Sequence, residues 1–177
     1  MLSFAIQEPA EFHEWLEILA ETKPRFGLEI GTYEGGSACL MLEALPKLKR
    51  LVTVDIVDRG PGLPPETAPY RDRMRFVQGD SHTLTTRDAV VRALGGKPLD
   101  FAFIDGHHAY ESVTSDFFLY APLVRSGGLV ALHDINSVHV GYDHTAGVAR
   151  FWDELCAREP GRCHGIRRRF GIGVYRR

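Results

Sequence analysis

The chain has 177 residues, a length that suits one domain with one sizeable hydrophobic core. Its 21 basic and 23 acidic residues give a net charge of −2, which does not indicate the basic excess of a nucleic-acid-binding protein. Three cysteines are too few for a disulfide framework and fit a reducing, cytoplasmic location. We expect no signal peptide, because no basic segment precedes an apolar run, and no membrane span, because no apolar stretch approaches ~18 residues.

An amphipathic helix is predicted from Glu8 to Thr22, where Phe12, Trp15 and Leu19 recur at helical spacing. Pro24 ends it, because the residue before a proline is pushed out of the helical region. Beyond this point, predicted strands alternate with predicted helices. Strands are expected at residues 25–30, 51–57, 74–78, 99–104 and 128–132, and helices at residues 37–45, 83–94, 110–124 and 145–158. Residues 59–71 are predicted to form a Pro- and Gly-rich loop, and residues near 165–169 and 171–175 a closing hairpin.

Strands that alternate with helices indicate βαβ units and a parallel sheet, and apolar runs suit strands that are covered on both faces. The predicted fold class is therefore α/β: a Rossmann-like, doubly wound, mostly parallel seven-stranded sheet with a C-terminal antiparallel hairpin. We expect a single domain over residues 1–177, with an N-terminal helix (1–24), a cofactor-binding core (25–135) and a C-terminal helix and hairpin (136–177). Ligands of such sheets bind outside the carboxyl ends of the strands, so functional residues are expected directly after each strand.

A glycine-rich turn follows the first predicted strand, between Glu29 and Ser37. Glycines there permit a tight turn and a close approach of the backbone to a ligand at the start of the next helix. A dinucleotide fingerprint would need G-x-G-x-x-G, but Tyr33 occupies the position of the second glycine. Glu29 precedes the first glycine, Gly31, and a carboxylate there repels phosphate but neutralises an ammonium group. The pattern therefore favours S-adenosylmethionine over NAD.

Carboxylates also follow the second and third predicted strands. Asp55 ends the second strand, where it can accept hydrogen bonds from both hydroxyls of a ribose. Gly79, Asp80 and Ser81 follow the third strand, and Asp80 or Ser81 could bond the polar edge of an adenine. A strand-ending aspartate alone is often only a surface residue. Three such features after successive strands together favour a nucleoside site.

Two parts of the chain resemble known methyltransferases. The stretch Gly31-Thr32-Tyr33-Glu34-Gly35-Gly36-Ser37 is similar to the G-x-Y-x-G-x-S loop of catechol O-methyltransferase-like enzymes. Residues 100–110 (DFAFIDGHHAY) and 120–134 (YAPLVRSGGLVALHD) resemble the related class I S-adenosylmethionine-dependent methyltransferases of the sugar- and antibiotic-tailoring (methyltransferase 24-type) families. The resemblance covers roughly residues 26–177. It implies a cofactor site lined by Glu29, Gly31, Thr32, Tyr33, Gly35, Ser37, Asp55, Ile56, Gly79, Asp80, Ser81 and Asp105.

Asp105 and Asp134 follow the fourth and fifth predicted strands, so their carboxylates are expected to converge at the carboxyl edge of the sheet. Paired carboxylates suit a hard divalent cation such as Mg²⁺. Such a cation would hold a substrate hydroxyl, lower its pKa and orient it toward the methyl group. The competing interpretation is structural: Asp105 caps local backbone and Asp134 bonds a neighbouring loop.

The resemblance refines this metal hypothesis. Catechol-type enzymes hold their metal with an Asp after the fourth strand and an Asp-Asn pair after the fifth, but here Ile135 stands at the Asn position. In the sugar-methylating relatives an acidic residue precedes the second Asp, and here that residue is His133. His133 is thus a candidate third ligand beside Asp105 and Asp134, better suited to Mn²⁺, Fe²⁺ or Zn²⁺ than to Mg²⁺. Asn136 is another candidate oxygen donor.

A general base is also required. His108 stands where the resemblance places the catalytic lysine of catechol-type enzymes, and an unperturbed pKa near 6.5 suits proton removal at neutral pH. His107 is the alternative.

The sequence thus predicts an S-adenosylmethionine-dependent methyltransferase, an enzyme of the transferase class. The expected reaction is O-methylation of a small hydroxylated acceptor of glycosyl or secondary-metabolite type, with Mg²⁺ or Mn²⁺ as an assisting metal. Two alternatives stay open: a metal-independent methyltransferase with His108 or His107 as base, and a non-catalytic S-adenosylmethionine-binding domain. The expected partners are a small-molecule acceptor and a second copy in a homodimer, with neither nucleic acid nor membrane. Residues 60–69 and 137–147 are candidate walls of the acceptor pocket.

Overall fold

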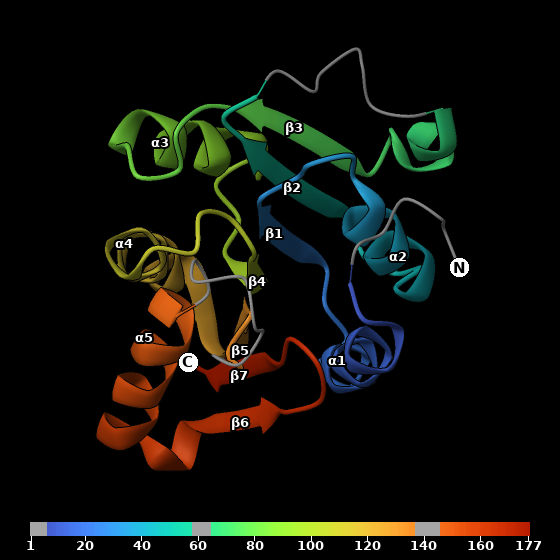
Figure 1. Ribbon diagram of the computed structural model, residues 1–177. Coiled ribbons are helices and arrows are strands. Elements are labelled where there is room, and N and C mark those ends of the chain that lie inside the picture. Colours follow the sequence, from blue (N-terminus) through green and yellow to red (C-terminus); the bar gives the residue numbers. More distant parts are fainter. Residues whose placement is uncertain (1–6, 58–64, 137–145) are drawn as a thin grey trace.

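A seven-stranded sheet forms the centre of the molecule in the computed structural model, which describes residues 7–57, 65–136 and 146–177 (Figure 1). The strand order is β3-β2-β1-β4-β5-β7-β6. Five strands are parallel: β1 (Phe26–Ile30), β2 (Arg50–Asp55), β3 (Met74–Gln78), β4 (Leu99–Ile104) and β5 (Val124–His133). Strand β7 (Ile172–Arg176) pairs antiparallel with both β5 and β6 (Cys163–Ile166). This confirms the predicted fold class.

Helices cover both faces of the sheet (Figure 1). Helices α1 (Pro9–Glu21) and α2 (Gly36–Ala44) lie on one face; α3 (Leu84–Ala93), α4 (Tyr110–Tyr120) and α5 (Ala146–Arg158) lie on the other. Successive strand side chains point to opposite faces, which divides the core in two. Leu28 and Ile30 therefore pack with α3, α4 and α5, whereas Phe101 and Phe103 pack with α1 and α2. Within the described residues, no helix has the length and apolar character of a membrane span.

Helix α1 is fixed on the sheet by aromatic packing over β4. The Trp15 ring stacks on Phe103 with centroids 6.2 Å apart, and Phe12 meets Phe103 edge-on at 5.7 Å. Full burial of such a side chain contributes about 1.5–3 kcal/mol to folding. At the start of the helix, the Glu8 carboxylate accepts a hydrogen bond from the Glu11 backbone N–H at 2.8 Å. The Glu8 cap and the Phe12 and Trp15 rings together hold the first turn of α1 beside the carboxyl edge of the sheet.

Several predicted boundaries are wrong by a few residues. The helix predicted at 110–124 ends at Tyr120 and continues as a 3-10 turn (Ala121–Leu123), because Pro122 cannot continue an α-helix. Strand β5 consequently begins at Val124 instead of Gly128. Strand β2 ends at Asp55, because the Asp55 side chain accepts the Val57 N–H and starts a turn. The predicted loop at 59–71 contains a 3-10 helix (Pro65–Tyr70), whereas residues 58–64 and 137–145 lie outside the described part of the chain.

Candidate functional site

The turns after the five parallel strands meet at the carboxyl edge of the sheet. Gly31, directly after β1, has a φ of +92°. A Cβ atom at Gly31 would lie 2.0 Å from the backbone carbonyl oxygen of Asp105, which follows β4. Only glycine permits both this conformation and this approach, so the β1 and β4 turns are in direct contact. Gly35 also has a positive φ, +79°, and begins α2 without a side-chain cap.

Glu29 is a fully buried carboxyl group at the base of this glycine turn. The Ser37 hydroxyl donates a hydrogen bond to its Oε1 atom, while Oε2 is buried without a hydrogen-bond partner among the described residues. The pKa of Glu29 is raised to about 8, chiefly by burial and to a smaller extent by the nearby carboxylates Asp105 and Asp55, against the opposing effect of the Ser37 hydrogen bond. An orphaned buried oxygen of this kind is suited to an ammonium donor supplied by a ligand.

Asp55 is held between two turns at the end of β2. Its Oδ2 atom accepts the Tyr33 N–H at 2.8 Å, and its Oδ1 atom accepts the Val57 N–H at 2.9 Å. Each carboxylate oxygen keeps a further lone pair for a ligand hydroxyl. Tyr33 itself has a φ of +45°, an uncommon conformation for a residue with a side chain. Ile56 lies beside Asp55 with 69% of its surface exposed, and Thr32 is buried.

The turn after β3 contains a chain of charged groups that the sequence indicated only in part. The ring of His82 lies between Asp80 Oδ1, 3.3 Å from Nδ1, and Asp116 Oδ1, 3.6 Å from Nε2. Asp116 is buried on α4; burial raises its pKa to about 6, partly offset by Ser81 and His82. An aspartate in the apolar stripe of that helix was the overlooked signal. Packing alone explains the glycine at position 79, because a Cβ atom there would lie 2.4 Å from the Thr86 hydroxyl.

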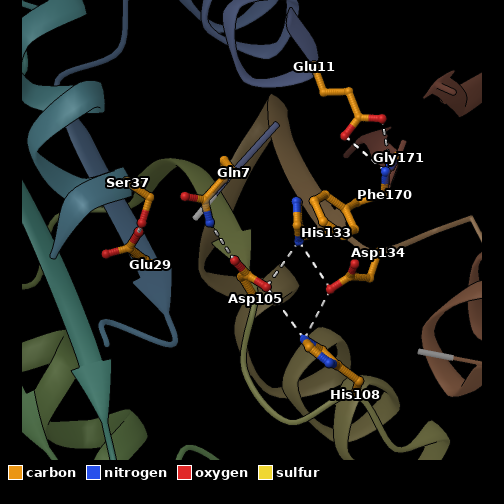
Figure 2. Close-up of polar contacts among 10 residues, drawn as sticks. All are labelled: Gln7, Glu11, Glu29, Ser37, Asp105, His108, His133, Asp134, Phe170 and Gly171. Atoms are coloured by element: carbon orange, nitrogen blue, oxygen red, sulfur yellow. Dashed lines mark hydrogen bonds and ion pairs between the residues drawn. The ribbon is translucent and has the colours of Figure 1, made fainter. Parts of the chain in front are cut away.

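Four residues converge after β4 and β5 and are called the Asp-His cluster below: Asp105, His108, His133 and Asp134 (Figure 2). His108 Nε2 lies 3.5 Å from Asp105 Oδ1 and 3.2 Å from Asp134 Oδ2. His133 Nδ1 lies 3.3 Å and 3.1 Å from the same two oxygens. The two aspartates predicted to converge therefore do so, and each histidine bridges them.

The cluster balances its charges internally. Burial alone would lower the pKa of His133, but Asp105 and Asp134 outweigh it and raise that pKa to about 10. Burial would likewise raise the pKa of Asp105, yet His133 and His108 hold it well below its usual range. The pKa of His108 is raised, chiefly by its contact with the Asp105 carboxylate. Two carboxylates thus face two histidine rings whose pKa values are raised, an arrangement in which a divalent cation can take the place of a bound proton.

The donor atoms of the cluster fit a divalent cation. One carboxylate oxygen from each of Asp105 and Asp134 and one ring nitrogen of His108 all lie within 4.8 Å of one another. Among the described residues, this set does not include the predicted ligand His133, although its Nδ1 faces the same two carboxylate oxygens. Mixed oxygen and imidazole donors suit Mn²⁺, Fe²⁺ or Zn²⁺ better than the all-oxygen preference of Mg²⁺.

Asp134 adopts the left-handed conformation, with a φ of +66°. A residue with a side chain is held there at a cost of roughly 1–3 kcal/mol, and such residues concentrate at functional sites. The chain beyond it is tied to the turn that precedes β7. The Ile135 N–H donates to the Gly171 carbonyl at 3.3 Å, and the Asn136 N–H donates to the Phe170 carbonyl at 2.8 Å.

Other predicted residues lie apart from the cluster. His107 is exposed, and its Nδ1 lies 3.0 Å from the Ser112 hydroxyl on α4. The Ile135 side chain is buried in the core on the α3–α5 side of the sheet. Asn136 donates to the Arg168 and Arg169 carbonyls at 3.4 Å each instead of facing the cluster.

One residue beside the cluster was missed by sequence reasoning. The Gln7 side chain donates to Asp105 Oδ2 at 2.9 Å, so the segment before α1 contacts the cluster (Figure 2). A lone glutamine before a helix gives no signal in the sequence.

Similarity to known proteins extends over most of the chain. A family model described as a methyltransferase domain matches residues 28–135. An uncharacterised protein of Acanthamoeba polyphaga mimivirus is 35% identical over 127 residues, which cover 67% of this chain and 57% of that protein. The rhamnosyl O-methyltransferase of Mycobacterium tuberculosis is 25% identical over 128 residues, covering 72% of this chain and 52% of the enzyme. The chain therefore spans about half the length of the curated relatives it matches.

Solved structures share the fold. An O-methyltransferase from Bacillus cereus in complex with S-adenosylhomocysteine superposes with a TM-score of 0.74 at 20% identity, covering 99% of this chain and 84% of that one. The methyltransferase MycE of the mycinamycin biosynthetic pathway, in complex with Mg, S-adenosylhomocysteine and mycinamycin VI, gives a TM-score of 0.62 at 19% identity, covering 98% of this chain and 50% of that one.

Proposed function

We propose that this chain, which belongs to the class I S-adenosylmethionine-dependent methyltransferase family matched over residues 28–135, transfers a methyl group to an oxygen atom of a small hydroxylated acceptor. The observation that carries the proposal is the position of the Asp-His cluster. It lies directly beside the glycine turn, where the missing side chain of Gly31 leaves room for the Asp105 carbonyl. A cofactor held by that turn would present its methyl group close to the cluster.

The cofactor site is proposed to use three carboxyl groups for three parts of S-adenosylmethionine. Glu29 offers its unpartnered Oε2 to the ammonium group, and Asp55 offers its remaining lone pairs to the ribose hydroxyls. Asp80 or Ser81 is proposed to form a hydrogen bond with the polar edge of the adenine. Gly31 and Gly35 provide the tight turn around the methionine moiety. The glycine turn disfavours a dinucleotide, because Tyr33 stands where a dinucleotide fingerprint needs its second glycine.

A divalent cation fits the cluster, with Asp105 and Asp134 as oxygen ligands and His108 as the nitrogen ligand. His133, whose Nδ1 faces the same two carboxylate oxygens, is the alternative nitrogen ligand. When bound, it would hold the acceptor hydroxyl and lower its pKa. The MycE complex contains Mg together with mycinamycin VI, which supports a metal in a protein of this fold. The histidines of this chain favour Mn²⁺ over Mg²⁺.

His108 is the proposed base. The acceptor oxygen attacks the methyl carbon, the bond between that carbon and sulfur breaks, and S-adenosylhomocysteine leaves. The hydroxyl proton passes to the neutral form of the His108 ring, which Asp105 and Asp134 orient through its Nε2 atom. The His107 ring instead lies against Ser112. Positioning the acceptor and the methyl group in line supplies most of the rate, up to roughly 7–11 kcal/mol in favourable cases.

The proposed acceptor is a glycosyl or secondary-metabolite hydroxyl. The rhamnosyl O-methyltransferase relative supports a sugar, and the MycE complex, which contains mycinamycin VI, supports a product of a biosynthetic pathway. A metal-independent reaction is the second candidate. It is favoured by one observation: without a metal, His108 already lies within 3.5 Å of both carboxylates, which could orient the base unaided.

Calorimetric titration tests the proposal. We expect S-adenosylhomocysteine to bind in the micromolar range and NAD not to bind, and tighter binding of NAD would refute the cofactor assignment. Methyl transfer to a panel of rhamnosides and hydroxylated macrolides should then be measured with and without a chelator. Loss of turnover in chelator and its return with Mn²⁺ would support the metal, whereas unchanged turnover would favour the metal-independent reaction.

A further inference from the structure

Glu11, on the first turn of α1, has a fully buried carboxylate that is not explained by packing alone (Figure 2). It accepts three backbone N–H groups from one turn: Arg168 at 3.1 Å, Phe170 at 3.2 Å and Gly171 at 3.0 Å. Backbone donors of this number satisfy a buried charge without a cationic partner. Glu11 therefore ties the helix to a turn about 160 residues further along the chain.

That turn, residues 168–171, contacts the Asp-His cluster from the outside. Its Gly171 and Phe170 carbonyls accept the N–H groups of Ile135 and Asn136, the two residues after Asp134. Gly171 has a φ of +82°, and a Cβ atom there would lie 2.8 Å from Ile135 and Asn136 side-chain atoms. The turn thus fits closely against the residues that hold Asp134 in its left-handed conformation.

The same turn places an aromatic ring on His133. The Phe170 ring centroid lies 5.7 Å from that of His133, and Phe103 lies 6.1 Å away from it. Phe103 in turn packs against Phe12 and Trp15 of α1. His133 is therefore oriented by two aromatic rings, both of which depend on the position of α1.

We propose that Glu11 is a positioning residue of the Asp-His cluster, because its carboxylate fixes the 168–171 turn, and that turn fixes His133 and Asp134 for binding a divalent cation. The inference rests on the proposed metal-assisted function. Glu11 does not touch the cluster itself. Loss of its charge should loosen the turn, which releases Ile135 and Asn136 and lets the His133 ring move away from Asp105 and Asp134.

The test compares Glu11→Gln with Glu14→Gln. Glu14 is a matched control, because it lies on the same helix and also contacts Arg168, but through an exposed ion pair of 3.1 Å. Mn²⁺ affinity is measured by calorimetry and the Mn²⁺ environment by electron paramagnetic resonance. We expect Glu11→Gln to weaken Mn²⁺ binding by roughly 10- to 100-fold, the usual effect of losing a supporting interaction at a metal site. Glu14→Gln should change it less than about twofold.

Two further measurements distinguish a failure of the Glu11 proposal from a failure of the proposed metal site. S-adenosylhomocysteine affinity should stay unchanged in Glu11→Gln, because no contact joins the glycine turn to the 168–171 turn within the described residues. Parallel loss of both affinities would mean general unfolding, and the decision then passes to Phe170→Leu. The ring signals of His133 in ¹H–¹⁵N spectra of metal-free protein should shift in Glu11→Gln and not in Glu14→Gln. If wild-type protein fails to bind Mn²⁺, the proposed metal fails, yet these ring signals still decide whether Glu11 positions His133.

If Glu11→Gln does not fold, Phe170→Leu tests the link one step further along. This variant keeps the buried carboxylate and its three donors but removes the ring from His133. A shift of the His133 ring signals and weaker Mn²⁺ binding support the proposal. Wild-type values for both would overturn it.

Discussion

His108 Nε2 lies 3.2 Å from Asp134 Oδ2, although one residue precedes α4 and the other follows β5. The parallel pairing of β4 with β5 brings these turns together, with Ile104 opposite Leu132 at the ends of the strands. The proximity has two interpretations. In one, His108 is the base and Asp134 holds the metal; in the other, both bind the metal.

Replacing Asp134 tests the metal. Asp134→Ala removes an oxygen ligand and leaves His108 and His133 with one bridging carboxylate, Asp105. Mn²⁺ affinity should fall by more than the roughly 10- to 100-fold that follows loss of a supporting interaction. S-adenosylhomocysteine affinity should remain, since Glu29 and Asp55 are untouched. Calorimetry with each ligand measures both effects, and undiminished Mn²⁺ binding would remove Asp134 from the ligand set.

Replacing His108 separates a base from a ligand. If His108 is the base, His108→Gln should lower kcat by about 10²- to 10⁴-fold and leave Mn²⁺ affinity nearly unchanged. A large loss of Mn²⁺ affinity would instead identify His108 as a ligand. His107→Gln is the control, because the His107 ring contacts Ser112 and not the cluster. A larger kcat loss in His107→Gln than in His108→Gln would identify His107 as the base.

The parts of the site that could be predicted are those that topology fixes. Asp55, Asp105 and Asp134 each follow a parallel strand, so the sheet brings them to one edge regardless of side-chain packing. Apolar patterns likewise predicted the five α-helices and the five parallel strands, which the structure confirms with changes at their ends. Boundaries such as the end of α4 depended on one proline within a continuous apolar pattern, which periodicity does not resolve.

The parts that could not be predicted depend on contacts distant in sequence. Glu11 lies four residues before Trp15, on the buried face of α1, but the sequence does not show that its partners come from the 168–171 turn. Asp116 stands out in the sequence only as an aspartate in the apolar stripe of α4, and its partner His82 belongs to the turn after β3. No local pattern identifies the partners of such residues, because those partners come from other elements.

Helix α5 is predicted to set the position of the His108 turn. A Cβ at Gly147 would lie 2.3 Å from the Tyr110 backbone nitrogen and 2.5 Å from the His108 carbonyl oxygen. Both are backbone atoms, which cannot move away by a change of side-chain rotamer. Gly147→Ala should therefore displace the turn and lower kcat by roughly 100-fold, the effect of a ~1 Å misplacement. Gly161→Ala is the control, with open space around its Cβ. Equal kcat values in the two variants would show that α5 shifts to make room for the Cβ and that the His108 turn keeps its position.

Glu29 should make stability depend on pH. Its pKa is raised from the ordinary 4.5 to about 8, mainly by burial, so the folded state binds this proton more tightly than the unfolded state. The contribution of the protonated Glu29 carboxyl to the free energy of unfolding is complete below about pH 4.5 and is lost as pH rises toward 8. Glu29→Gln removes this dependence. We therefore expect the variant to be more stable than wild type near pH 8, with the advantage shrinking toward pH 5.

Denaturant unfolding at pH 5, 6, 7 and 8 measures this difference, and Glu43→Gln, an exposed carboxyl on α2, is the control that should show none. The same Glu29→Gln variant should bind S-adenosylhomocysteine at least about tenfold more weakly, because a hydrogen bond to a charged group contributes roughly 1.5–3 kcal/mol. Higher stability with weaker binding would identify Glu29 as a residue kept for the cofactor at a cost to the fold. A stability difference that grows toward pH 5 would contradict the sign of the shift.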